Sequence, residues 1–460
     1  MQAKSKIFAI SFLSCWSALL CATEPNTVIA TINVGVNPAG LALTPDNRFA
    51  YVANNNNYTL PNVDNVSVLD LTNNLLAATI SSPTFNQPYT VTMNAAGTRA
   101  YVTNSNSTTV SIIDVATNTV IGTIGGFDGP SGLVILPDGV TAYVNNYGGP
   151  EGVLSGNGTT VRVVNLNTNA IVGAPITVDL APAALARSPD GAFVYTINYV
   201  DGNPGTGTMS VIRTSDNTVI DTITGFSGPF AIAVTADGKF AYVTNFGSNN
   251  FFPFGTTVSV VNLVTNAISA TINLDIQPSG IALTPDGRFA YATNYDTLYT
   301  STYFSSLVAG QGTVNIIDTA TNTVIPPIIA VGQSPANVAI SSDGRFAYVS
   351  NYTSNTVNVI ALPSFQIQAQ GCKVRNIFLL QEDLVNKLTW SASGSSLPVS
   401  YALYRDAALT DLLTTIPATD PLEFFDHFRN PAITYTYYLV GTNAVGTTSE
   451  PLAITVTQNC

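Results

Sequence analysis

The sequence is poor in charge. Only 9% of its 460 residues are charged, against about 25% in an ordinary soluble domain. Lysine and arginine number 15 against 27 aspartates and glutamates, which gives a net charge of −12. Affinity for nucleic acid comes largely from cationic side chains that neutralise phosphates, so this composition argues against a nucleic-acid partner. The low charge also excludes coiled coils and highly charged helical bundles.

Catalytic and metal-binding side chains are scarce, above all in residues 23–363. That region contains no histidine, cysteine or tryptophan, and Glu151 is its only glutamate after Glu24. Nucleophile pairs that need histidine, and metal sites built from it, are therefore excluded there. Aspartate is well represented, so a carboxylate site remains open. We expect no cofactor, no metal site and no catalytic residue, and we interpret the single histidine, His427, as a solvated loop or strand-end residue.

Residues 1–22 have the pattern of a secretory signal peptide. Two lysines precede an apolar run from Ile7 to Leu20, which is shorter than the roughly 20 residues of a membrane-spanning helix. Cleavage after Ala22 fits this pattern, and a lipoprotein signal ending before Cys15 is a weaker alternative. We therefore expect an exported protein, periplasmic, on the cell surface or secreted, with no transmembrane segment after cleavage.

The sequence is rich in internal repeats. A segment typified by residues 278–291, Pro-Ser-Gly-Ile-Ala-Leu-Thr-Pro-Asp-Gly-Arg-Phe-Ala-Tyr, recurs seven times at intervals of about 50 residues. The aligned tyrosines are Tyr51, Tyr101, Tyr143, Tyr195, Tyr242, Tyr291 and Tyr348. In every repeat a proline lies 13 residues before the tyrosine and an asparagine three residues after it.

Each repeat has the pattern of four short strands. The first follows the proline and leads into an Asp-Gly turn such as Asp286-Gly287, a strong hairpin signal between apolar runs. The second carries the tyrosine, the third alternates apolar and polar residues as in 258–261, and the fourth follows a Thr-Asn turn as in 119–124. Four-stranded units at this period predict an all-β, seven-bladed β-propeller.

The ends of the repeat region predict how the ring closes. The seventh repeat lacks its fourth strand, whereas residues 26–32 have the pattern of a spare one. Asn26 precedes Pro38 by the same 12 residues that separate Asn118 from Pro130. We therefore expect the N-terminal strand to complete the last blade, which removes an exposed sheet edge.

These repeats resemble the YVTN family of β-propeller repeats, named for the Tyr-Val-Thr-Asn that occurs here at 101–104 and 242–245. The resemblance covers residues 26–363. It implies an exported seven-bladed propeller but no single activity. The chain departs from the pattern at 196–197, where Thr-Ile stands for Val-Thr, and at Ala96, which replaces the turn aspartate of the second repeat.

Beyond the propeller, assigned to residues 23–363, we expect a linker at 364–371 and a small β-sandwich at 372–460. Strands are predicted around Leu388–Trp390, at 401–404 and at 435–440, with Trp390 in the core. The run 435–446 resembles the penultimate strand and turn of fibronectin type III domains, and by that resemblance Tyr435 is the tyrosine-corner residue.

The two cysteines left after cleavage are Cys372 and Cys460. Export favours a disulfide between them. In the fibronectin type III strand order, however, the first and last strands place them at opposite poles, roughly 25 Å apart, whereas a disulfide needs Cα atoms within about 7 Å. The sequence therefore predicts no bridge within the domain.

The repeated Asp, Tyr and Asn residues are interpreted as structural. Asp with Gly sets the turn, Tyr packs between blades, and Asn caps a strand end in a left-handed conformation. Length varies mainly in the loop between the second and third strands of each repeat, and loops on a rigid scaffold commonly carry function.

Two of these loops are rich in aromatic residues, which predicts a contact with a protein or glycan partner. The alternative, that the rings pack on each other as loop cores, remains open. Arg187 is a further candidate, because its counterparts in the other repeats are all apolar; it either contacts a ligand or an aspartate near the channel mouth, or extends to solvent. The candidate binding residues are Phe246, Phe251, Phe252, Phe254, Tyr295, Tyr299, Tyr303, Phe304 and Arg187.

The function that we expect is an exported, non-enzymatic binding or surface-interaction module. The loop face would bind an envelope or extracellular partner, and the sandwich would act as a spacer or second binder. Two alternatives remain: an enzyme similar to seven-bladed lactonases, with carboxylates at the channel mouth, and a structural envelope protein that assembles with itself.

Overall fold

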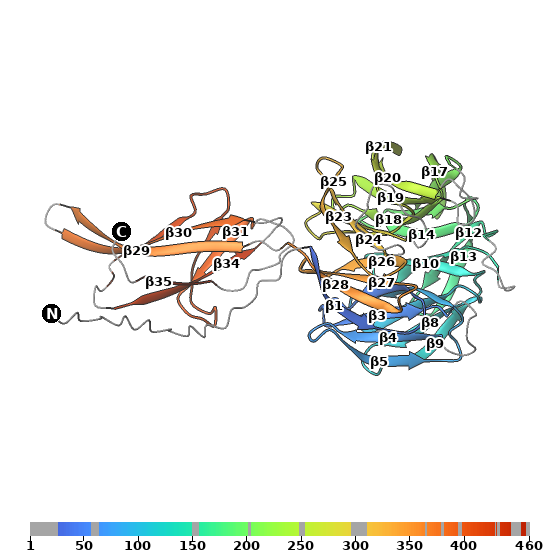
Figure 1. The fold of residues 1–460 in the computed structure, drawn as a ribbon, viewed down its shortest axis with the longest axis horizontal. Helices are drawn as coiled ribbons and strands as arrows, with labels where there is room; N and C mark the ends of the chain where they lie inside the picture. The colour runs from blue at the N-terminus through green and yellow to red at the C-terminus, as the bar shows by residue number, and fades with distance from the viewer. Residues whose placement is uncertain are drawn as a thin grey trace, which may run out of the picture.

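The computed structural model describes residues 26–56, 64–149, 156–200, 204–247, 254–295, 311–363, 366–378, 381–393, 398–427, 429, 433–442 and 452–456. These residues form strands and turns and no helix. Figure 1 shows two bodies, one built from β1–β28 and the other from β29–β35. The first is a seven-bladed β-propeller, as the repeats predict.

Each blade is a four-stranded antiparallel meander. The innermost strands are β2 (Pro38–Leu43), β6 (Pro88–Met93), β10 (Pro130–Ile135), β14 (Pro182–Arg187), β18 (Pro229–Val234), β22 (Pro278–Leu283) and β26 (Pro335–Ile340). The second strands are β3 (Phe49–Asn54), β7 (Arg99–Asn104), β11 (Thr141–Asn146), β15 (Phe193–Asn198), β19 (Phe240–Gly247), β23 (Phe289–Asn294) and β27 (Phe346–Asn351).

The outer half of each blade contains the other two strands. The third strands are β4 (Asn65–Asp70), β8 (Thr109–Asp114), β12 (Thr160–Asn165), β16 (Gly207–Arg213), β20 (Phe254–Asn262), β24 (Thr313–Asp318) and β28 (Thr356–Ala361). The outermost strands are β5 (Leu75–Ser81), β9 (Thr119–Gly125), β13 (Ala170–Thr177), β17 (Thr218–Phe226), β21 (Ala267–Asn273), β25 (Thr323–Ala330) and β1 (Thr27–Asn33).

The ring closes through the N-terminal strand, and this prediction is confirmed. Strand β1 pairs with β28, so the last blade has the order β1-β28-β27-β26. Each innermost strand contacts the next in the order β2, β6, β10, β14, β18, β22, β26, and β26 contacts β2 again. The seven innermost strands therefore form a closed ring around a central axis, and we call the region along this axis the channel.

The hydrophobic core lies between adjacent blades. One cluster joins Ile32, Val357 and Tyr348 of the last blade to Leu41 and Val52 of the first. Because β1 contributes Ile32 to this cluster, the N-terminal strand adds buried apolar area as well as backbone hydrogen bonds.

The second body is a small β-sandwich. One sheet has the order β29 (Gln366–Phe378), β30 (Gln381–Ser393) and β33 (Glu423–Asp426). The other has the order β32 (Leu412–Pro417), β31 (Ser400–Tyr404), β34 (Tyr435–Thr442) and β35 (Leu452–Val456). Trp390 is 6% exposed and lies in the core between the sheets, as predicted.

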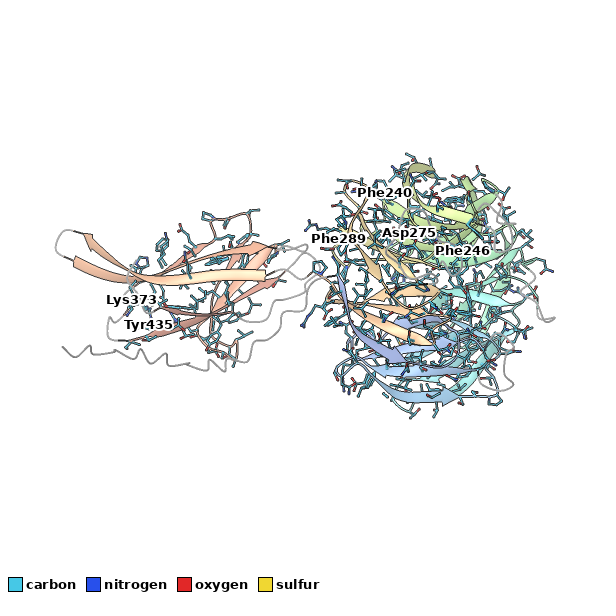
Figure 2. The ribbon with its side chains drawn as sticks, in the orientation of Figure 1. Phe240, Phe246, Asp275, Phe289, Lys373 and Tyr435 are labelled. Atoms are coloured by element: carbon cyan, nitrogen blue, oxygen red, sulfur yellow. The ribbon has the colours of Figure 1, made fainter. Side chains whose placement is uncertain are left out.

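The buried tyrosine of β34 is Tyr437. Its hydroxyl donates to Asp426 at 2.6 Å and accepts from the Asn386 amide at 2.8 Å. Tyr435, which the fibronectin resemblance makes the corner residue, is half-buried and has the Arg429 guanidinium over its ring. Figure 2 labels Tyr435 within the sandwich.

Residues 366–371, which the sequence analysis places in a linker, belong to β29. Their alternation of glutamines with Ile367 and Ala369 is a strand pattern. Cys372 therefore lies inside a strand and does not start one, so the premise of the pole-to-pole distance was wrong. The neighbouring Gly371 packs against Val456, and Val456 lies four residues from Cys460, a span of at most about 14 Å. Cys460 is outside the described residues, and the absence of a bridge stays a prediction.

Candidate functional site

The propeller has two different faces. At one edge of the propeller, the innermost strands begin and the second strands end. The same edge contains the connections between blades and the loops between second and third strands. We call this edge the loop face. The opposite edge carries the hairpin turns, and we call it the turn face.

A repeated backbone arrangement forms the inner rim of the loop face. The residue before each proline has a left-handed backbone, with φ between 51° and 56°. Its carbonyl oxygen accepts a hydrogen bond from the residue that follows the repeated asparagine, as in Asn55 to Asn37 and Tyr295 to Gln277. This bond fixes the residue after each asparagine beside the channel mouth.

Five of these seven rim positions are aromatic. They are Asn55, Ser105, Tyr147, Tyr199, Phe246, Tyr295 and Tyr352. The residue after each proline adds two more rings, Tyr89 on β6 and Phe230 on β18. Phe246 and Tyr295 are among the predicted binding residues, and the other rings were not predicted, although they occupy the aligned position after the repeated asparagine or after the proline.

The rings from adjacent blades contact one another. Phe230 stacks on Phe246 with ring centroids 5.1 Å apart, and Phe246 meets Tyr295 edge-on at 5.7 Å. Tyr295 then lies 6.3 Å from Tyr352. Phe246 is 5% exposed, whereas Tyr295, Tyr352 and Phe230 are only partly buried.

Tyr89 extends this group across the channel. Its pKa is raised by burial and then by the nearby phenol groups of Tyr147, Tyr352 and Tyr295. These residues come from the second, third, seventh and sixth blades, and only the central channel borders all four. We name the set the axial aromatic cluster, and it consists of Tyr89, Tyr147, Phe230, Phe246, Tyr295 and Tyr352.

The loop face is acidic. Its loops and blade connections contain no lysine, arginine or histidine. The acidic residues in their described parts are Asp64, Asp128, Asp179 and Asp275. The nearest cation in an adjoining strand is Arg162, the third residue of β12, which is half-buried.

The candidate binding residues are only partly brought together. Phe246 and Tyr295 belong to the axial aromatic cluster. Phe254 begins β20, pairs with Gly247 and is half-buried. Figure 2 labels Phe246 and Asp275 on the propeller. The candidates outside the described residues are Phe251, Phe252, Tyr299, Tyr303 and Phe304.

Arg187 lies on the other face. Strand β14 begins at Pro182 on the loop face and ends at Arg187 on the turn face. The Arg187 guanidinium donates to the carbonyl oxygens of Ser188 and Pro189 at 3.2 and 3.3 Å. It therefore extends along its own turn, away from the aromatic rings.

The repeated polar residues hold the blades together. Asp46 accepts the Thr44 hydroxyl at 2.6 Å, and the same bond recurs in the turns of four other blades. The repeated asparagines do not have left-handed backbones, which corrects that prediction. Their side-chain amides donate to third-strand side chains, as Asn104 does to Thr109 and Ser111. A left-handed asparagine does occupy the turn before each outermost strand, where Asn118 has φ of 53°.

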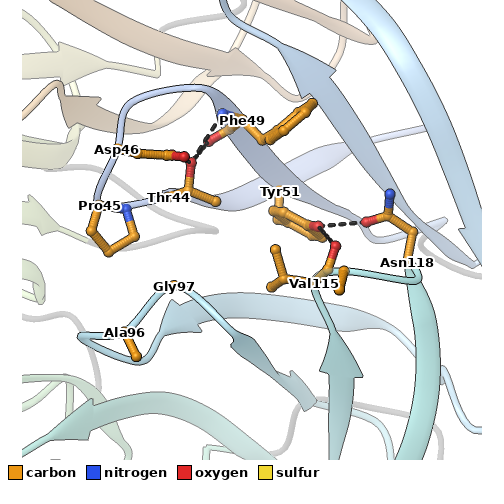
Figure 3. A pocket seen from close by; sticks show the side chains of 10 residues that line it. Thr44, Pro45, Asp46, Phe49, Tyr51, Ala96, Gly97, Val115 and Asn118 are labelled. Atoms are coloured by element: carbon orange, nitrogen blue, oxygen red, sulfur yellow. Dashed lines mark hydrogen bonds between the residues drawn. The ribbon is translucent and has the colours of Figure 1, made fainter.

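A cavity of about 390 Å³ opens between the first two blades on the turn face (Figure 3). Ala96, in place of the repeated turn aspartate, forms part of its wall. The Thr44 hydroxyl holds the pKa of Asp46 below its usual value, and the Tyr51 hydroxyl donates to Asn118. Because these polar groups already bond each other, we assign them to the joint between the blades.

Two further features bear on the possible chemistry. The described parts of the chain contain no group of three or more His, Cys, Asp or Glu side chains placed to hold a metal ion. Nor do the described residues form a helix of the length and hydropathy needed to cross a bilayer.

No protein-family model matches the chain. The seven-bladed β-propeller protein Rv1057 of Mycobacterium tuberculosis is 31% identical over 169 residues, which is 36% of this chain and 39% of that protein. PE_PGRS18, a PE-PGRS family protein of the same organism, is 49% identical over 59 residues, 13% of each chain. The chain thus spans less than half the length of these relatives.

Among solved structures, hydrazine synthase of Kuenenia stuttgartiensis superposes with a TM-score of 0.58 at 20% identity, covering 75% of this chain and 99% of that one. At this identity the likeness concerns the fold alone. Together, the strand topology, Rv1057 and this structure show a β-propeller, a fold that in general serves binding and interaction.

Proposed function

We propose that the chain is an exported, non-enzymatic binding module that contacts a protein or glycan partner through its loop face. The observation that carries this proposal is the axial aromatic cluster, which gathers six rings from five blades at one end of the channel. Aromatic residues anchor many interfaces because each combines a large apolar area with few rotatable bonds.

Other observations support a loop-face site. On the turn face the repeated aspartates and tyrosines serve turns and blade joints, whereas three hydroxyls of the cluster make no hydrogen bond with a described residue. They belong to Tyr89, Tyr147 and Tyr352. Export is supported by the leader pattern at 1–22, which lies outside the described residues. The sandwich would act as a spacer or a second binder.

The test is capture of partners from an envelope extract by the immobilised chain. In one variant the loop at 296–310 is replaced by Ser-Asn-Ser-Thr, the short loop that the chain itself uses at 105–108. A second variant is Tyr295→Ala. The control is Val264→Ser on the turn face, where the valine is 76% exposed.

We expect both loop-face variants to lose a partner that the control retains, with melting temperatures close to that of the unmodified chain. Equal capture by all four proteins would contradict the proposal. Capture of the chain by itself, lost in the same variants, would instead favour the self-assembling envelope protein.

A further inference from the structure

We propose that the axial aromatic cluster receives a lysine side chain from a protein partner. This inference rests on the proposed function, because it names the chemistry of the partner at the same site. Three features support it: the arrangement of the partly buried rings, the phenol oxygens that no described residue bonds, and the charge of the surrounding face.

The first feature is the arrangement of the rings. Tyr89, Tyr147, Tyr295 and Tyr352 come from four blades around one channel and are all only partly buried. The face of a tyrosine ring attracts a cation within about 6 Å of its centroid. Rings contributed from several sides can therefore surround a single ammonium group.

The second feature is the set of phenol oxygens. The hydroxyls of Tyr89, Tyr147 and Tyr352 are each available to accept a hydrogen bond, since no described residue bonds them. A lysine ammonium carries three N–H donors and no acceptor. It can thus pair with the phenol oxygens while its alkyl stem packs on the partly buried ring of Phe230.

The third feature is charge. The charged residues in the described loops and connections of this face are all acidic, so they attract a cationic segment and raise its rate of encounter. Most propeller cations lie on the turn face, where Arg48, Arg288 and Arg345 each cover the ring of the next phenylalanine. The two faces therefore differ in their preference for a basic partner.

Lysine fits this site better than arginine. A guanidinium also stacks on aromatic rings, but its N–H donors lie in one plane and suit bidentate pairing with a carboxylate, whereas the phenol oxygens of the cluster come from several blades. The compact ammonium on a four-carbon stem can enter a channel end-on. The acids of the loop face would then lie around the peptide backbone that carries the lysine.

Calorimetric titration of the full chain with blocked hexalysine tests the proposal at near-physiological ionic strength. The variants are Tyr89→Leu, Tyr352→Leu and Tyr89→Phe, which all preserve the net charge. We expect each leucine variant to bind hexalysine about fivefold more weakly or worse, because a cation–π contact is lost. Tyr89→Phe should retain most of the affinity, because it keeps the ring.

A charge-matched pair completes the design. Asp128→Asn removes an exposed carboxylate from the loop face, while Asp216→Asn removes one from the turn face, where it pairs with Arg213. We expect only Asp128→Asn to weaken binding. Circular dichroism and melting temperature establish that every variant is folded.

Hexalysine affinity that is equal in the leucine variants and the unmodified chain would overturn the proposal, because it would reflect net charge alone. Tighter binding of choline than of hexalysine would also overturn it, in favour of a small-amine site. If hexalysine does not bind but the envelope partner is still lost from Tyr295→Ala, the lysine inference fails and the loop-face function stands. If the envelope partner is retained as well, both fail.

Discussion

The hydroxyl of Tyr291 donates to the side-chain oxygen of Asn26 at 2.7 Å, across 265 residues of sequence. Tyr291 lies in the sixth blade, and Asn26 immediately precedes β1, the strand that completes the seventh. Equivalent bonds link Tyr51 to Asn118, Tyr143 to Asn217 and Tyr242 to Asn322. The contact between the sixth blade and the strand that closes the ring therefore uses the same tyrosine–asparagine hydrogen bond as the contacts between other adjacent blades.

This relationship predicts a measurable coupling. Tyr291→Phe removes the donor, and Asn26→Gly removes the acceptor while tolerating the φ of 58° at that position. We expect each variant to lower the free energy of unfolding by about 1 kcal/mol, and the double variant to lose less than the sum of the two. Denaturant titration measures all four free energies. Strict additivity would mean that the bond does not contribute to closure.

The buried tyrosines predict a loss of stability in alkali. Burial, with a smaller contribution from a nearby carboxylate, raises the pKa of Tyr51, Tyr143 and Tyr242 to about 12 from 10.0. Burial and a nearby carboxylate also raise the pKa of Tyr195 and of Tyr348 to about 12. Because the folded state binds these protons more tightly, their contribution is complete below pH 10 and is lost as the pH rises from 10 to about 12.

Denaturant titrations between pH 8 and 12, with tyrosinate absorbance followed in parallel, measure this effect. Tyr143→Phe is the matched variant, and we expect its stability to fall less steeply over the same interval. A stability that is constant up to pH 12 would contradict the burial of these phenols.

The fold could be predicted from the sequence because every blade repeats the same local signals. The proline, the turn and the tyrosine have fixed offsets, and Asn26 has the spacing of a turn that precedes an outermost strand. The linker prediction failed because residues 366–371 do not match the propeller repeat, although they alternate as a strand does and begin β29. The same reasoning misplaced Cys372.

The candidate site was harder to predict. The aromatic content of two loops led to the prediction of Phe251 and Tyr303 as binding residues. Most rings at the channel mouth instead belong to residues that directly follow the end of a second strand. Tyr89 and Tyr352 are separated by 263 positions, and only closure of the ring brings them together. Sequence alone also left open whether Arg187 contacts a ligand or an aspartate, or extends to solvent, since its register does not reveal to which face the end of β14 points.

Arg187→Leu tests that last residue. It restores the apolar side chain found at the aligned position of the other repeats, and it removes two hydrogen bonds longer than 3 Å. We expect the free energy of unfolding to change by less than about 0.5 kcal/mol. Partner capture should be unchanged, because the residue lies on the turn face. Reduced capture at unchanged stability would return Arg187 to the binding site.

Phe246 and Phe254 should respond differently to the same substitution. Phe246 is 5% exposed and packs between Phe230 and Tyr295. Phe246→Ser should therefore lower the free energy of unfolding by about 3 kcal/mol or more, through the cavity and the buried hydroxyl that it introduces. Phe254 is only half-buried at the start of β20, so Phe254→Ser should lower the free energy of unfolding by less than half of that amount. It should weaken partner capture at a nearly unchanged melting temperature.

Denaturant titration and capture of the partner, measured on both variants, separate packing from binding. If Phe254→Ser destabilises the chain as much as Phe246→Ser, both rings form a loop core and the proposed contact loses one of its residues. If Phe246→Ser leaves stability intact, the stacked arrangement at the channel mouth is wrong. In that case the geometry on which the lysine inference depends would have to be abandoned with it.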